Sequence, residues 1–183
     1  MRAAVVAVLL LLATSSALVL SAAPAAAHGG DSAGVPAFFR TTVTSVTPGV
    51  EGLRVRSVER GARLQVTYDG PGVVEVLGDS GEPYLRLTSG GTETNLDSPS
   101  SWRDDDRLGA TEVPADADGR GRPRWVALGE EPVLTWQEHR AHWTGLELPE
   151  QVQAEPGEAR RVRDWTVPLV VDGAPVTVVG TLD

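Results

Sequence analysis

Short runs of residues that alternate between apolar and polar constrain the fold of this chain more than any other feature. The clearest runs are residues 53–58 (LRVRSV) and 62–68 (ARLQVTY). Because side chains of an extended strand point alternately to opposite faces, each run predicts a strand with one buried face. Turn residues such as Glu59-Arg60-Gly61 separate the runs. Strands and turns follow one another about every 8–12 residues, a spacing typical of a β-sandwich.

Further strands are expected where β-branched and other apolar residues gather between turns. Asp172-Gly173 joins the last two of these runs, and this dipeptide is typical of a tight β-hairpin. About nine strands result, and we predict an all-β fold, an immunoglobulin-like antiparallel β-sandwich, with a small β-barrel as the alternative. The additional runs are residues 39–47, 73–77, 84–88, 125–128, 133–136, 162–171 and 176–182.

The first residues have the organisation of a secretion signal. Arg2 supplies a positive charge, residues 3–20 form an apolar run, and Ala25-Ala26-Ala27 supplies the small residues of a cleavage site. The run is also long enough to cross a membrane, so an uncleaved anchor is the alternative. We predict a signal peptide over residues 1–27 and a secreted or extracytoplasmic protein of the cell surface, with no membrane span in the mature chain.

The rest of the chain divides into a short segment and one domain. Glycine-rich residues 28–37 predict a flexible N-terminal segment, and residues 38–183 predict the β-sandwich domain. Within the domain, the acidic stretch 97–122 lacks periodicity and predicts a long surface loop, and residues 146–159 predict another loop. Asp104-Asp105-Asp106 is interpreted as a solvated face of the long loop, because the other ligands of an EF-hand are absent.

Charge and motifs exclude several classes of function. The chain has 16 basic residues, all of them Arg, against 25 acidic residues, for a net charge of −9. Such a chain repels nucleic acid and anionic lipid, so neither is expected as a partner. The chain also has no cysteine, no Gly-x-Ser-x-Gly elbow, no phosphate-binding loop and no dinucleotide fingerprint. We therefore do not expect an enzyme.

The three histidines suggest a copper site. Signal cleavage after Ala27 makes His28 the N-terminal residue, whose α-amine and imidazole together chelate Cu(II) in the tetragonal geometry that this ion prefers. His139 or His142 would add a third nitrogen. Two histidines three residues apart share a face on a helical turn but not on a strand, so joint ligation requires a turn. A structural role for both rings is the alternative.

Residues 136–143 (WQEHRAHW) also have the composition of a binding surface. Trp and Arg are the usual anchors of protein interfaces, and Trp136, Arg140 and Trp143 are the candidates for partner binding. Arg140 is alternatively paired with Glu138 or with an acid of the long loop, and both tryptophans are alternatively structural. Trp165 is expected in the core.

The motif Glu138–Trp143 (EHRAHW) and the closing pattern Asp164–Gly173 (DWTVPLVVDG) resemble a family of exported actinobacterial proteins of uncharacterised function. The resemblance covers roughly residues 38–182. It implies a β-sandwich ectodomain, commonly followed by a membrane helix; here the sequence ends at Asp183 without a second apolar span. A weaker likeness, carried by His28 alone, is to copper-handling periplasmic β-sandwich proteins, which use a His after the signal cut as a Cu(II) ligand.

Three functions follow as hypotheses. The first is an exported non-enzymatic binding or accessory module of unknown specificity. The second is a Cu(II)-binding protein that uses His28 with His139 or His142, with copper as the ligand to be handled. The third is a copper oxygenase of the histidine-brace type, for which the sequence offers no substrate surface.

Overall fold

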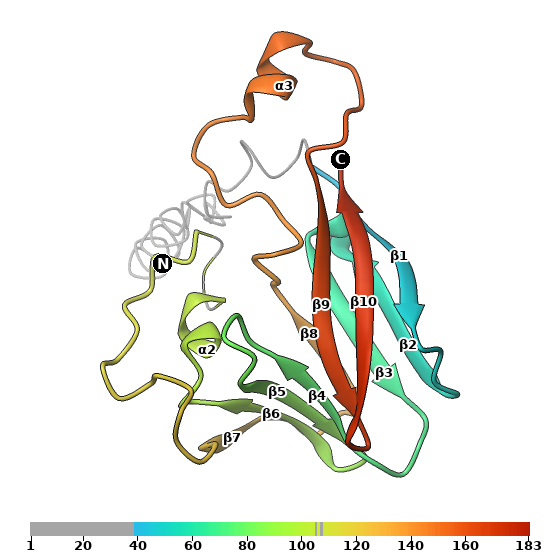
Figure 1. Ribbon diagram of the computed structural model, residues 1–183, viewed down its shortest axis with the longest axis vertical. Helices are drawn as coiled ribbons and strands as arrows, with labels where there is room; N and C mark the ends of the chain where they lie inside the picture. Colours follow the sequence, from blue (N-terminus) through green and yellow to red (C-terminus); the bar gives the residue numbers. More distant parts are fainter. Residues whose placement is uncertain (1–38, 105, 107) are drawn as a thin grey trace, which may run out of the picture. The chain divides into compact units, whose positions relative to one another are not determined.

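The computed structural model describes residues 39–104, 106 and 108–183 (Figure 1). The chain divides into two compact units, Met1–Asp31 and Ser32–Asp183, and every described residue belongs to the second. The predicted signal peptide, the segment 28–37 and His28 lie outside the described residues.

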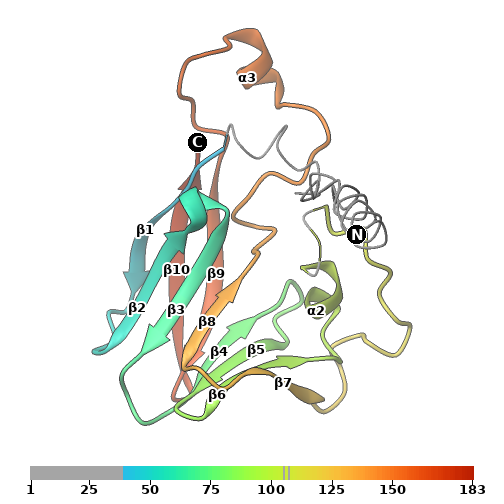
Figure 2. The same cartoon turned by 180° about the vertical axis from the view of Figure 1, so that it is seen from behind.

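The described part is an all-β sandwich of two antiparallel sheets, as the alternating runs predict. The larger sheet has seven strands in the order β1-β10-β9-β4-β5-β6-β7, and the smaller has three in the order β2-β3-β8. Figure 2 shows the small sheet lying in front of β9 and β10. The strands are β1 (Thr41–Thr47), β2 (Leu53–Val58), β3 (Arg63–Tyr68), β4 (Val74–Leu77), β5 (Pro83–Thr88), β6 (Gly91–Asn95), β7 (Trp125–Gly129), β8 (Val133–Trp136), β9 (Arg163–Val171) and β10 (Ala174–Leu182).

The predicted C-terminal hairpin is confirmed. β9 and β10 pair without interruption from Arg163 opposite Leu182 to Val171 opposite Ala174. Asp172 and Gly173 have φ angles of 51° and 80°. Two consecutive positive φ values are what the tightest hairpin turn requires, and Asp-Gly adopts them readily. The hairpin lies between β1 and β4 in the larger sheet.

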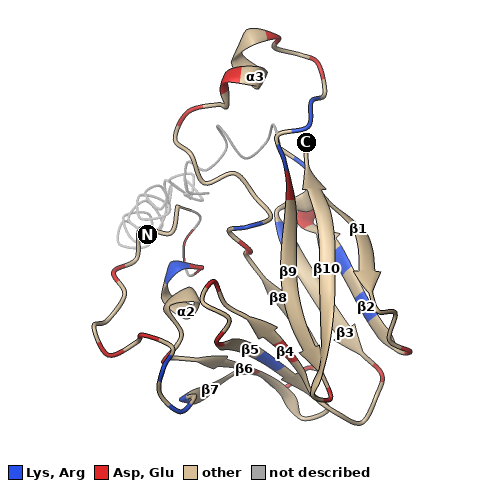
Figure 3. Cartoon of the chain, in the orientation of Figure 1, with Lys and Arg blue, Asp and Glu red and all other residues tan. Residues whose placement is uncertain are grey.

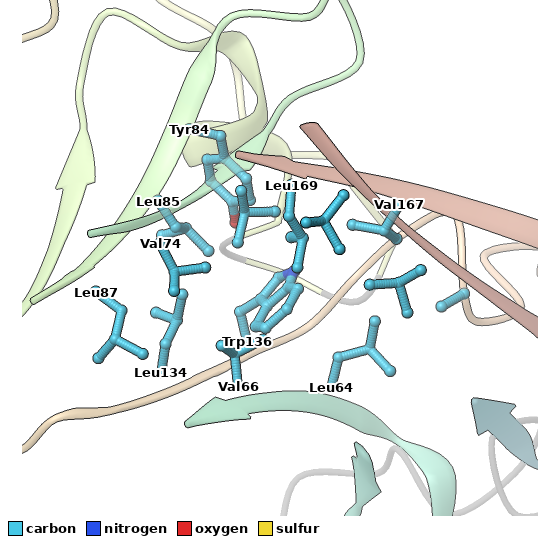
Figure 4. Close-up of a cluster of buried hydrophobic side chains, with 14 of the residues drawn as sticks. Leu64, Val66, Val74, Tyr84, Leu85, Leu87, Leu134, Trp136, Val167 and Leu169 are labelled. Atoms are coloured by element: carbon cyan, nitrogen blue, oxygen red, sulfur yellow. The ribbon is translucent and has the colours of Figure 1, made fainter. Parts of the chain in front are cut away.

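The core lies between the two sheets (Figure 4). Leu64 and Val66 of β3 and Leu134 and Trp136 of β8 face the larger sheet across this core. The strands of the larger sheet contribute every second residue, which is the periodicity seen in the sequence. Their fully buried apolar side chains are Val74, Val76, Leu87, Val167, Leu169, Val176, Val178 and Leu182. Trp165 is buried as predicted.

Three local predictions need correction. The described residues form ten strands rather than about nine. The additional strand, β6 (GTETN), is polar and carries no apolar alternation; it is a strand because it pairs with both β5 and β7. The predicted loop 97–122 contains the helix α2 (Pro99–Arg103), which Ser98 caps by accepting a hydrogen bond from the Ser100 N–H. The predicted loop 146–159 contains the helix α3 (Glu150–Ala154).

Candidate functional site

The segment that follows β8 carries the polar residues singled out in the sequence. The Ala141 N–H donates to the Glu138 carbonyl over 2.9 Å, so the chain turns sharply as it leaves the sheet. The Thr41 hydroxyl at the start of β1 donates to the Ala141 carbonyl and fixes this turn to the larger sheet. The turn places Glu138 inside the protein and its neighbours at the end of the sandwich.

Glu138 and Arg140 form an ion pair in which the carboxylate is buried and the guanidinium is half-buried. The Glu138 side chain is only 2 % exposed, and its two oxygens accept from Arg140 Nε and Nη2 over 2.7 and 2.8 Å. The Trp136 indole N–H donates to the same carboxylate, and Arg140 Nη2 also reaches the Leu77 carbonyl. Burial lowers the pKa of Arg140, but the hydrogen bonds and charge of Glu138 outweigh it and the net pKa is raised. The hydrogen-bonding groups of the two side chains are therefore largely satisfied inside the protein.

His139 is held by the long loop. Its Nδ1 contacts the Asp104 carboxylate, and its Nε2 lies 2.9 Å from the Asp106 carbonyl oxygen. Burial alone lowers the pKa of His139, yet the hydrogen bond and charge of Asp104 reverse this and raise it. Asp104 is itself buried, which raises its pKa despite the hydrogen bond from His139, and it is also hydrogen-bonded to Tyr84. The pKa of Tyr84 is raised well above its usual value by burial and by the nearby carboxylates of Asp104 and Glu138.

His142 and Arg163 lie on the other side of the same turn. His142 is buried, its ring lies near that of His139 with 5.0 Å between centroids, and its Nε2 is 3.4 Å from the Gln137 amide nitrogen. Arg163 Nη2 donates to the backbone carbonyls of both His139 and His142. Burial lowers the pKa of Arg163. A cavity of about 40 Å³ adjoins His142, which is room for little more than water.

Trp143 is half-buried against the core and stacks on Phe39, with ring centroids 5.7 Å apart and planes inclined by 26°. Its indole N–H donates to the Glu147 carbonyl over 2.8 Å. Phe39 lies directly before β1, so this stack joins the turn after β8 to the beginning of the domain. Phe39 also lines a much larger cavity.

The larger cavity has a volume of about 900 Å³ and lies between the start of β1, the β2–β3 turn and the segment around α3. Three arginines, Arg40, Arg60 and Arg160, line it together with two acids, Glu158 and Asp183. Each acid already has an arginine partner: Glu158 pairs with Arg160, and Asp183 pairs with Arg161. The remaining lining residues are Phe39, Thr41, Thr42, Ser57, Gly61, Val152 and Ala159.

The β2–β3 turn presents Arg60 to this cavity in an unusual conformation. Glu59 and Arg60 have positive φ angles of 52° and 62°, and Gly61 follows with 93°. A side chain at Gly61 would place its Cβ 2.7 Å from the Thr41 nitrogen, so the turn lies directly against β1. Non-glycine residues at positive φ are uncommon and occur often at functional sites. The contact holds Arg60 beside the residues that begin β1.

The structure brings some of the predicted site residues together and buries others. His139 and His142 are neighbours, as joint ligation requires, but both ring nitrogens of His139 already have partners. Trp136 is only 5 % exposed and belongs to the core, and Arg140 is committed to Glu138, so neither presents a free anchor. Trp143 is the predicted anchor that reaches the surface. Within the described ranges, no group of three or more His, Asp or Glu side chains is arranged to hold a metal ion.

Sequence reasoning missed the residues that complete this end of the sandwich. Asp104 was assigned to a solvated charge run, although it is buried against His139. Arg163 begins β9 and its contact with the histidine carbonyls follows from tertiary packing alone. For Arg60, the Glu-Arg-Gly turn was recognised, but nothing in the sequence indicates which side of the sandwich it faces.

Comparison of the chain with protein-family models, with curated proteins and with solved structures finds no match. None of the helices in the described ranges is long and apolar enough to span a membrane.

Proposed function

We propose that this chain is an exported, non-enzymatic binding domain that takes up an amphipathic anion at the β1 end of the sandwich. The ligand class is an apolar molecule that carries a carboxylate, phosphate or sulfonate group. The observation that carries the proposal is the cavity of about 900 Å³ with arginines and an aromatic ring in its wall. Ligand pockets commonly have volumes of about 300–1,000 Å³ and combine apolar walls with a few charged groups.

The charges of the lining residues favour an anion. Arg40 and Arg60 form no ion pair with any described residue, although the charge of Arg40 contributes to the lowered pKa of Asp183. Arg160 binds Glu155 and Glu158 through Nη2, while its Nε is buried without a hydrogen-bond partner among the described residues. In a chain of net charge −9, two arginines in one cavity that form no ion pair among the described residues give a local positive field. Arg is also the side chain best suited to planar recognition of carboxylate or phosphate.

The non-enzymatic part of the proposal is supported by the turn after β8. Four side chains near this turn have chemistry that could serve catalysis, but they bind one another. His139 is hydrogen-bonded to Asp104, and Arg140 is hydrogen-bonded to Glu138. These hydrogen bonds stabilise the turn, and they leave none of the four side chains as a free base or nucleophile. Export is supported by the signal-like residues 1–27.

The first test is a fluorescence titration with anilinonaphthalene sulfonate, an aromatic anion with the proposed chemistry. The natural sequence is expected to bind one probe saturably. Arg60→Gln and Arg160→Gln are expected to weaken binding by roughly fivefold each, the effect of one charge-assisted hydrogen bond at a partly exposed site. Arg54→Gln is the matched control, because Arg54 lies exposed on β2 and pairs with Asp69. Equal binding by all four proteins, or no saturable binding, would refute the proposal.

Cu(II) binding is the second candidate, and the 5.0 Å separation of the His139 and His142 rings is the observation that favours it. Against it, His139 would have to release Asp104 or the Asp106 carbonyl, and Arg163 places a positive charge at the backbone of both histidines. The test is a Cu(II) titration of protein beginning at His28 beside protein extended by one Gly. Much tighter binding by the first would support the N-terminal chelate, and equal weak binding would remove it.

A further inference from the structure

The edge of the larger sheet at β7 is exposed over almost its whole length. Among the described strands, β7 pairs only with β6. Four of its residues are exposed: Val126, Ala127, Leu128 and Gly129. Val126 and Leu128 are 45 % and 56 % exposed, which makes them two of the most exposed large apolar side chains of the described residues. A solvent-exposed edge with apolar side chains is a surface to which another strand can add.

The charges on either side of β7 are opposite in sign. Arg120, Arg122 and Arg124 precede the strand, and Glu130 and Glu131 follow it. Figure 3 shows the basic residues at the start of β7. An antiparallel copy of the same strand, related by a two-fold axis near Ala127, would place Arg124 opposite Glu130 of the second copy, and the reverse. The same alignment brings Val126 of one copy to Leu128 of the other.

We propose that β7 is a self-complementary interface through which two copies of this chain associate antiparallel, edge to edge. A two-fold contact of this kind is closed, because each copy uses the same strand that its partner uses. The apolar pair supplies burial, and the two Arg–Glu pairs at the ends fix the antiparallel direction.

Three features limit this association to a short contact. The register between β6 and β7 shifts between Thr92 and Glu93, which makes Leu128 an extra residue of β7 and twists the edge. Pro123 and Pro132 flank the segment and lack the N–H that a longer ladder would use. The interface is therefore small and its affinity low. Sedimentation should detect the dimer at protein concentrations between roughly 10 µM and 1 mM.

The test is a charge exchange followed by sedimentation equilibrium. Glu130→Arg makes both ends of the strand basic, and Arg124→Glu makes both ends acidic. Each variant alone is expected to self-associate roughly tenfold more weakly than the natural sequence, whereas an equimolar mixture is expected to regain the association as a heterodimer. The proposal would be overturned if the natural sequence stayed monomeric at all concentrations, or if the mixture associated no more strongly than either variant alone.

Arg124 also binds Asp116 and the Leu96 carbonyl, so a second pair of variants avoids it. Leu128→Ser removes an exposed apolar side chain from the interface and leaves the core intact. Leu146→Ser is its matched control, because Leu146 is 74 % exposed and lies far from β7 in the sequence. Weakened association by the first and not by the second is expected. Equal behaviour of the two variants would contradict the placement of the interface on β7.

Discussion

The Asp104 carboxylate is hydrogen-bonded to Nδ1 of His139, a residue 35 positions later in the chain. This contact joins the long loop after α2 to the turn after β8. Because Nε2 of the same ring lies 2.9 Å from the Asp106 carbonyl oxygen, the imidazolium form donates to both acceptors at once. The protonated ring is thus the form that fastens the loop to the sandwich.

The first prediction concerns pH. The raised pKa of His139 means that its contribution to stability is fully present below pH 6.5, the unfolded value, and is lost as pH rises through the folded value. The free energy of unfolding should fall as pH rises from 6.5 through the folded pKa and level off above it, with a slope of at most about 1.4 kcal/mol per pH unit for one proton. Urea denaturation across this range measures the slope. His139→Gln should flatten it; a slope unchanged in that variant would show that another group is responsible.

A second prediction concerns the buried pair of Glu138 and Arg140. Glu138→Ala removes the main carboxylate partner of the Arg140 guanidinium, which is 21% exposed and keeps Asp79 at 3.9 Å. The loss of stability should therefore be about 3 kcal/mol, the lower end of the range for breaking a buried pair. Replacing both residues, as Glu138→Leu with Arg140→Met, removes both charges and should recover most of the loss. Chemical denaturation of the two proteins distinguishes them. If the double variant is less stable than Glu138→Ala, the pair contributes more than it costs and the argument fails.

A third prediction concerns close packing between β10 and its neighbours β1 and β9 in the larger sheet. A Cβ at Gly180 would lie 2.0 Å from Cζ2 of Trp165 and 2.3 Å from the Thr42 carbonyl oxygen. Gly180→Ala should therefore destabilise the protein by about 1–3 kcal/mol or more, because neither backbone nor indole can move aside freely. Gly129→Ala is the control in a strand, since its Cβ meets the Thr92 hydroxyl oxygen at an ordinary 3.6 Å. Similar thermal midpoints for the two variants would contradict this account.

The parts of the fold that sequence patterns predict are those fixed by local alternation. β2, β3 and the β9–β10 hairpin follow from the period of two and from Asp172-Gly173. β6 cannot be predicted in this way, because its residues are polar and its extended conformation depends on pairing with neighbouring strands such as β5. The sequence does not predict the two short helices, because five residues are too few to show a helical period. Ser98 before Pro99 is nevertheless a recognisable helix start signal.

The candidate site was predictable only in part, because its geometry is tertiary. The motif around His139 and His142 identifies the correct segment. The spacing of residues within it does not show that Trp136 faces the core or that the Asp104 side chain is buried against His139. The cavity at the β1 end gathers residues from the start of β1, the β2–β3 turn and the segment around α3. No local pattern marks such a combination.

The most direct measurement of the proposed function is to follow the amide chemical shifts of the protein during addition of anilinonaphthalene sulfonate. The account predicts saturable shifts concentrated at lining residues of the large cavity, such as Arg40, Arg60, Gly61 and Ala159. The exposed strand β7 serves as an internal reference that should not change at low protein concentration. Saturable shifts centred on β7 or on another surface, with the cavity residues unchanged, would contradict it.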